Sequence, residues 1–76
     1  MKLTLLVQPD TTPDGENAGF SSLCPELDVA SQGDTEAEAR ANLKEALELF
    51  LEDADEREVA RRLASGARVT QLELAA

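Results

Sequence analysis

The sequence predicts a small two-layer α+β domain in which one long helix covers one face of a mixed β-sheet. Segments with alternating side chains occupy residues 2–32, a segment with apolar residues at helical spacing follows, and another alternating segment lies near the end. A chain of 76 residues is enough for one domain, spanning residues 1–76. The predicted order of elements is therefore strand, strand, strand, helix, short helix, strand.

The first predicted strand runs from Lys2 to Gln8. Its alternation places Leu3, Leu5 and Val7 on one face, as expected for a half-buried strand. Leu6 breaks the pattern because it lies on the opposite, nominally outer face. We therefore expect that outer face to be partly covered, for instance by another subunit.

Two further strands follow a predicted turn. Residues 9–15 contain two prolines, two aspartates and a glycine, which is the composition of a hairpin loop. The second strand spans 19–24, with Phe20 as its inward anchor, and Pro25 limits its continuation. Residues 27–32 alternate again and form the third predicted strand.

The start of the long helix carries the strongest local signal in the chain. Thr35 and Glu38 have the spacing of a capping box, with Asp34 as the alternative cap, so the helix begins at about Glu36. Gly33 precedes them, and we expect it to turn the chain through backbone angles that other residues avoid.

The helix carries an apolar stripe that must pack against the sheet. The stripe consists of Ala39, Leu43, Ala46, Leu47, Phe50 and Ala54. Together with the inward residues of the strands it predicts a core of Leu3, Leu5, Phe20, Leu43, Leu47 and Phe50. Because the chain has only two aromatic residues, this core is mainly aliphatic and modest in size.

After the long helix, Asp55 and Glu58 repeat the capping spacing and predict a short helix over 56–65. Gly66 is the expected left-handed residue at its C-terminal end. Residues 68–74 then alternate like a terminal strand. A right-handed return through the helices places this strand beside the first and parallel to it, which gives the sheet order 3-2-1-4.

The charge and composition of the chain exclude several kinds of function. Seven basic against 16 acidic residues give a formal charge of −9, which disfavours nucleic acid and favours a basic protein partner, although acidity alone also serves solubility. The chain has no histidine, so we expect no metal and no cofactor. Its longest early apolar run is too short for a signal peptide or a membrane span, so we expect a cytoplasmic protein.

No combination of residues predicts an enzyme. Glu38, Glu45 and Glu52 lie along one helix flank, but that pattern is typical of a solvated surface. Cys24 has no histidine to act as its base, and we expect a packed thiol rather than a nucleophile.

Three blocks of sequence, taken together, resemble a known family. They are Cys24-Pro25-Glu26-Leu27, Ser31-Gln32-Gly33-Asp34-Thr35 and Asn42-Leu43-Lys44-Glu45-Ala46-Leu47. Their order and spacing resemble the C-P-[DE]-L, S-x-G-[DE]-T and N-x-x-E-A-[IL] pattern of the HicB-like antitoxins. The match covers residues 3–54, and residues 69–74 resemble the closing strand of short members.

The resemblance implies a partial ribonuclease-H-like fold of the HicB N-terminal type. It also implies an antitoxin of a type II toxin-antitoxin system, which binds and masks a small basic HicA-like toxin that cleaves mRNA. Typical members continue into a C-terminal DNA-binding domain. We expect a short, single-domain member without that domain and without direct nucleic acid binding.

The chain is also predicted to self-associate as a dimer or a higher oligomer. Leu6 and, more weakly, Leu49 are apolar residues that one subunit leaves unused, because Leu49 lies on the flank away from Leu47. The alternative function is therefore a stand-alone homo-oligomeric structural or regulatory protein with no toxin partner.

Overall fold

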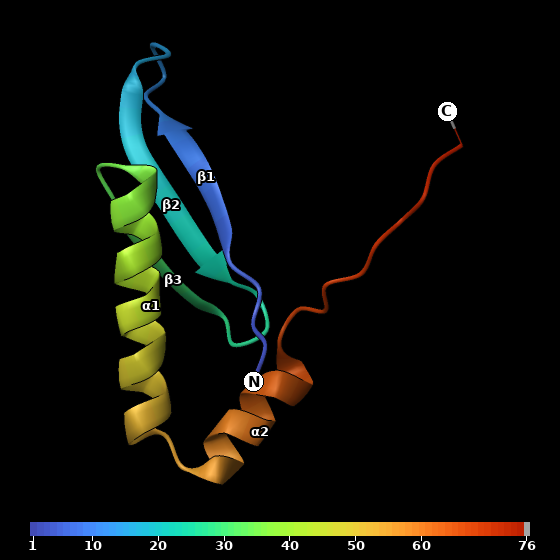
Figure 1. Ribbon diagram of the computed structural model, residues 1–76. Helices are drawn as coiled ribbons and strands as arrows, with labels where there is room; N and C mark the ends of the chain where they lie inside the picture. The colour runs from blue at the N-terminus through green and yellow to red at the C-terminus, as the bar shows by residue number, and fades with distance from the viewer. Residues whose placement is uncertain (76) are drawn as a thin grey trace.

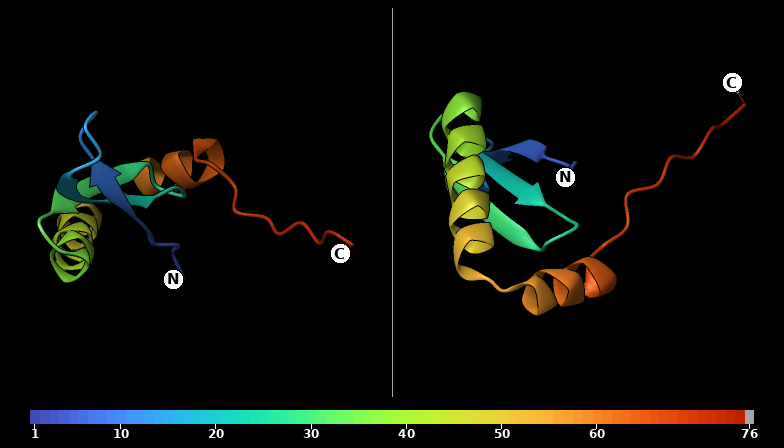
Figure 2. Two further views of the ribbon diagram at one scale, coloured as in Figure 1. Left: turned by 90° about the horizontal axis from the view of Figure 1, so that it is seen from above. Right: turned by 60° about the horizontal axis from the view of Figure 1, so that its bottom comes forward.

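Three antiparallel strands and one long helix form the two layers of the molecule (Figure 1). The computed structural model describes residues 1–75. The elements are β1 (Leu6–Thr11), β2 (Asn17–Cys24), β3 (Val29–Gly33), α1 (Glu36–Asp53) and α2 (Glu56–Ser65). Figures 1 and 2 show α1 against one face of the sheet, with α2 at one end of it. The predicted α+β class is confirmed.

The register of the sheet decides which residues face α1. Val7 lies opposite Ser22 in β2, and Ser22 lies opposite Ser31 in β3. The Ser22 hydroxyl donates to the Ala39 carbonyl oxygen of α1 at 2.8 Å, so this row faces the helix. The neighbouring row of Leu6, Leu23 and Ala30 therefore lies on the opposite face of the sheet.

The predicted fourth strand is not formed within the chain. Within residues 1–75 the sheet has the order β1-β2-β3, so the predicted order is correct for three strands, and the sheet is antiparallel rather than mixed. Residues 68–75 are extended and leave the body of the molecule (Figure 1). The alternation of a segment indicates an extended conformation, but it carries no information about which sheet edge the segment joins.

The strand boundaries differ from those predicted by a few residues. β1 begins at Leu6 and continues through Pro9, which is tolerated because β1 is an edge strand. The hairpin loop accordingly shortens to residues 12–16. β3 begins at Val29, because Asp28 turns the chain with a φ of 55°.

The core lies between the sheet and α1 and is mainly aliphatic. Its buried apolar members are Cys24, Leu27, Ala39, Leu43 and Leu47, with Leu3, Leu5, Val29 and Phe50 half-buried against them. Leu43 and Leu47 are thus buried, whereas Leu3, Leu5 and Phe50 lie at the margin of the core.

Phe20 is the exception among the predicted core residues, because it is half-buried and lies outside this cluster. Phe20 pairs with Pro9 on one side and with Gly33 on the other, at the end of the sheet where α1 begins. Alternation along β2 correctly predicts that Phe20 lies on the face of the sheet turned toward α1. It does not show that the helix covers that end of the sheet only partly.

α2 docks against the end of the sheet and the end of α1. The Arg62 guanidinium donates to the Leu27 carbonyl oxygen at 3.0 Å and lies over the Phe50 ring, 4.7 Å from its centroid. The Ala67 amide donates to the Pro25 carbonyl oxygen at 3.1 Å. These contacts attach α2 to the turn between β2 and β3.

Gly66 caps α2 in a way that corrects the predicted left-handed conformation. Its φ is −72°, so no unusual backbone angle requires a glycine here. A Cβ at this position would lie 2.0 Å from the Glu26 carbonyl oxygen, which only glycine avoids. The glycine is needed because two backbone segments approach closely.

Candidate functional site

The N-terminus of α1 has the predicted cap with one change of partner. Thr35 is the N-cap residue, and its hydroxyl accepts from the Glu38 amide at 3.1 Å. The Glu38 carboxylate accepts from the Asp34 amide at 2.8 Å rather than from the Thr35 amide, as the capping box would have it. Asp34 and Glu38 thus close the turn into the helix from either side of Thr35.

Gly33 is required for a different reason from the one predicted. Its φ is not positive, unlike those of Gly15 and Gly19. A Cβ on Gly33 would lie 2.6 Å from the Ala39 amide nitrogen and 2.7 Å from the Glu38 Cβ. The first turn of α1 therefore packs directly on the backbone of β3, and Gly33 makes room for it.

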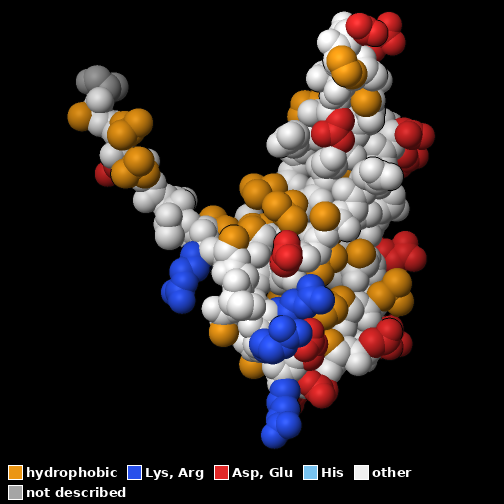
Figure 3. Space-filling view, turned by 180° about the vertical axis from the view of Figure 1, so that it is seen from behind, with side chains coloured by type: hydrophobic (Ala, Val, Ile, Leu, Met, Phe, Trp, Pro, Cys, Tyr) orange, Lys and Arg blue, Asp and Glu red, His pale blue; other side chains and the backbone are white. Residues whose placement is uncertain are grey.

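The open face of the sheet is the first surface available to a partner. It is the face turned away from α1, and a shallow hollow of about 680 Å³ lies over it. The hollow is lined mainly by Leu6, Gln8, Ser21, Leu23, Ala30 and Gln32. Leu6 is 51% exposed here, and Figure 3, which views the molecule from behind, shows apolar side chains on this side.

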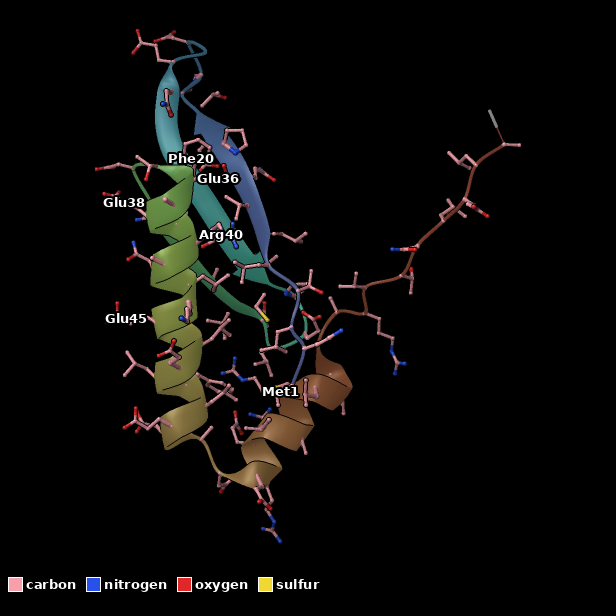
Figure 4. All side chains as sticks on the ribbon, in the orientation of Figure 1. Met1, Phe20, Glu36, Glu38, Arg40 and Glu45 are labelled. Carbon is pink, nitrogen blue, oxygen red and sulfur yellow. The ribbon has the colours of Figure 1, made fainter. Side chains whose placement is uncertain are left out.

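The outer flank of α1 is the second such surface and is acidic. Glu38 and Glu45 project from the side of α1 away from the sheet (Figure 4), and Glu52 is exposed on the same helix. Leu49 is 53% exposed among them, so the flank has one apolar side chain within a negative field. Basic side chains instead gather over α2 (Figure 3), where Arg61 and Arg62 pair with Glu58.

A polar cluster at the end of β2 ties the N-terminal segment to the core. The Glu26 carboxylate accepts from the Thr4 hydroxyl at 2.6 Å and from the Thr4 amide at 2.9 Å. These hydrogen bonds lower the pKa of the Glu26 carboxyl, the Thr4 hydroxyl contributing most. The cluster holds residues just before β1 against the turn after β2.

Cys24 lies beside this cluster, and its surroundings suppress its reactivity. The side chain is fully buried, and burial raises the pKa of the thiol, with the negative charge of Glu26 adding to the effect. The thiol donates weakly to the Glu26 carboxylate, with sulfur and oxygen 3.6 Å apart. A buried, neutral thiol of this kind packs the core and is a poor nucleophile.

Within residues 1–75, no group of three or more histidine, cysteine or acidic side chains is arranged to hold a metal ion. None of the helices over the same range is both long and apolar enough to cross a bilayer.

Two features of this region were not predicted. Leu27 is fully buried in the turn before β3, although the sequence predicted it as a strand residue. Glu26 pairs with Thr4 across 22 positions of the chain, and no local pattern connects the two residues. Only the fold brings them together.

The structure is that of a small α+β domain with an open sheet face and an acidic helix flank. UPF0150 protein ssl0738 of Synechocystis sp. is homologous to the chain, with 51% identity over 39 residues. The matched region covers 50% of this chain and spans about half (54%) of that relative. No family model and no solved structure matches the chain.

Proposed function

We propose that the chain is a HicB-like antitoxin that binds a small basic HicA-like toxin and masks its RNA-binding surface. The sequence blocks described above support this assignment, and homology to a UPF0150 protein is compatible with it. The single buried thiol suits a reducing compartment, and we place the protein in the cytoplasm. Inhibition is by contact, with no chemical step on the antitoxin.

The observation that carries the proposal is the unneutralised acidity of the surface. Of the 16 acidic residues of the chain, only Glu48 and Glu58 form ion pairs within residues 1–75. The Lys44–Glu48 pair is long, at 3.8 Å, and highly exposed, so it offsets little of the field of α1. A surface of this kind accelerates encounter with a cationic protein and disfavours RNA or DNA.

The test is co-expression of the full chain with the product of the adjacent reading frame, which the proposal expects to be a short basic protein, followed by co-purification. For a complex, we expect the association rate constant to fall as salt rises. We propose the acidic outer flank of α1 as the contact surface, so the double variant Glu45→Lys, Glu52→Lys should slow association roughly tenfold. The matched control Asp14→Lys, Glu16→Lys reverses two exposed charges in the hairpin loop and should have a much smaller effect.

Failure to form a complex would contradict the antitoxin proposal. The exposed Leu6 on the open sheet face favours the second candidate function, a stand-alone homo-oligomeric structural or regulatory protein. The two candidates differ in one respect that is easily measured, because only the antitoxin restores growth when a toxin is expressed.

A further inference from the structure

Residues 68–74 have the pattern of a strand but no strand partner in their own chain. Leu72 and Leu74, two positions apart, share one side of the extended segment. Leu72 is 84% exposed and Leu74 81% exposed, while Val69 on the other side is 54% exposed. An extended segment that exposes apolar residues and unpaired backbone groups is prepared to add to a sheet edge.

The outer edge of β1 is the matching half of such an interaction. Within residues 1–75, β1 pairs with β2 alone, which leaves its other side without a strand. Pro9 has no backbone N–H, so an added strand gains hydrogen bonds chiefly along the part of the edge that precedes it. That part of β1 consists of residues 6–8, so it can pair with part of the segment 68–74.

An apolar groove lies beside the start of this edge, on the helix side of the sheet. It has a volume of about 400 Å³, and Leu5, Leu47 and Leu51 supply its apolar walls. α1 packs mainly over β2 and β3, so the side of the helix nearer β1 is less covered. Arg40, which also lines the groove, lies on this side of α1 (Figure 4).

A strand added to the edge would meet this groove with alternate side chains. If Leu72 and Leu74 point toward the helix side, they lie over Leu5, Leu47 and Leu51, and the polar Gln71 and Glu73 point to the other face. Sheet edge, groove and side-chain alternation therefore match one another.

The path of the chain favours a second copy as the donor of this strand. The Ala67 amide is held by the Pro25 carbonyl oxygen, and from there the segment runs away from its own sheet in every view (Figures 1 and 2). Pairing with its own β1 would require a bend of the segment toward the sheet after Ala67. Pairing with another molecule requires none.

We propose that residues 68–74 of one copy add to the outer edge of β1 of a second copy, placing Leu72 and Leu74 over the groove of Leu5, Leu47 and Leu51. Reciprocal exchange of the two segments gives a closed two-fold dimer with no strand edge left at β1. This inference is independent of the proposed function, since a dimer of this kind forms with or without a toxin.

Sedimentation of the full chain over a range of concentrations tests the assembly. We expect a dimer whose dissociation constant rises at least about tenfold in Leu72→Glu, because the charge would enter the groove. The matched control is Leu63→Glu, which alters another exposed leucine, on α2, and should leave the dimer unchanged. A chain that is monomeric at all concentrations, or a dimer that tolerates Leu72→Glu, overturns the proposal.

A mixed-label experiment decides whether the pairing is between copies. One preparation carries ¹³C in its leucine methyl groups and the other is unlabelled, and isotope-filtered nuclear Overhauser effects are recorded on the mixture. The proposal predicts contacts between the Leu72 methyl groups of one copy and those of Leu5 or Leu47 of the other. Contacts found only within one chain would show closure on its own edge and would overturn the exchange.

Discussion

Glu26 joins two parts of the chain that local sequence does not connect. Its carboxylate accepts both the amide and the hydroxyl of Thr4, and its own carbonyl oxygen lies where a side chain on Gly66 would have to be. One residue thus binds the segment before β1 and lies in close contact with the end of α2. The backbone of Glu26 contacts Gly66, and its charged side chain binds Thr4.

The ionisation of Glu26 gives folding a pH dependence. The pKa of the carboxyl is lowered in the folded protein, chiefly by the hydrogen bond from the Thr4 hydroxyl. The stabilisation is therefore fully present above the ordinary pKa of a glutamate and is lost as the pH falls through the lowered value. We expect the melting temperature to fall as the pH drops below about 4.

The variant Glu26→Gln separates this residue from the other carboxylates. At neutral pH it should melt below the wild type, and the difference should be smaller at about pH 3, because the wild-type carboxyl becomes protonated as the pH falls through its lowered pKa. Glu52→Gln, an exposed position on α1, is the control. An equal difference at both pH values would assign the effect to shape rather than to charge.

Gly33 makes a second prediction at the residue scale. Gly33→Ala should destabilise the protein by about 1–3 kcal/mol, because the new Cβ would press on the backbone of the first turn of α1. Thr35→Ala, which removes one cap hydrogen bond, should cost about 1 kcal/mol. Urea unfolding of both variants measures these losses. If Gly33→Ala left the free energy of unfolding unchanged, the first turn of α1 would be free to shift away from β3.

At the scale of elements, Phe50 is the contact through which α1 and α2 stabilise each other. Its ring is half-buried against the core and carries the Arg62 guanidinium on its face. Phe50→Ala should destabilise the chain by roughly 3 kcal/mol, the lower end of the range for phenylalanine because burial is partial. Chemical denaturation measures this loss, and Phe20→Ala, outside the core cluster, should cost less.

The two helices were predictable because their signals are local. α1 begins at Glu36 and α2 spans 56–65, as the two capping patterns indicate, since a cap is completed within four residues. The strands were predictable in their faces but less so in their extent and pairing. β1 reaches Thr11 past a proline, and residues 68–74 have no partner, because pairing depends on residues distant in the sequence.

The surfaces, like the helices and strands, include features that local sequence predicts and features that depend on distant residues. The exposure of Leu6 and Leu49 follows from alternation and helical spacing, and the structure leaves about half of each side chain accessible. The groove of Leu5, Leu47 and Leu51 was not predictable, because it depends on where α1 lies relative to β1. Their role in self-association stays a prediction.

At the scale of the whole molecule, few apolar residues are buried in comparison with those that are exposed. Five apolar residues are buried, while eight large hydrophobic side chains are exposed within residues 1–75. A domain of this size gains little stability from such a core alone. Association that covers the exposed leucines would add to the stability of the fold, and the proposed strand exchange would cover two of them.

The buried thiol of Cys24 also allows transient opening of the core to be measured by chemical labelling. The sequence has one cysteine and neither tryptophan nor tyrosine, so intrinsic fluorescence and near-UV absorbance report unfolding weakly, while a thiol reagent has one target. Because the side chain has no exposed surface, the reagent can react only after β2 and α1 separate. When reclosing is fast, the labelling rate divided by that of an unfolded peptide gives the fraction of time the core spends open.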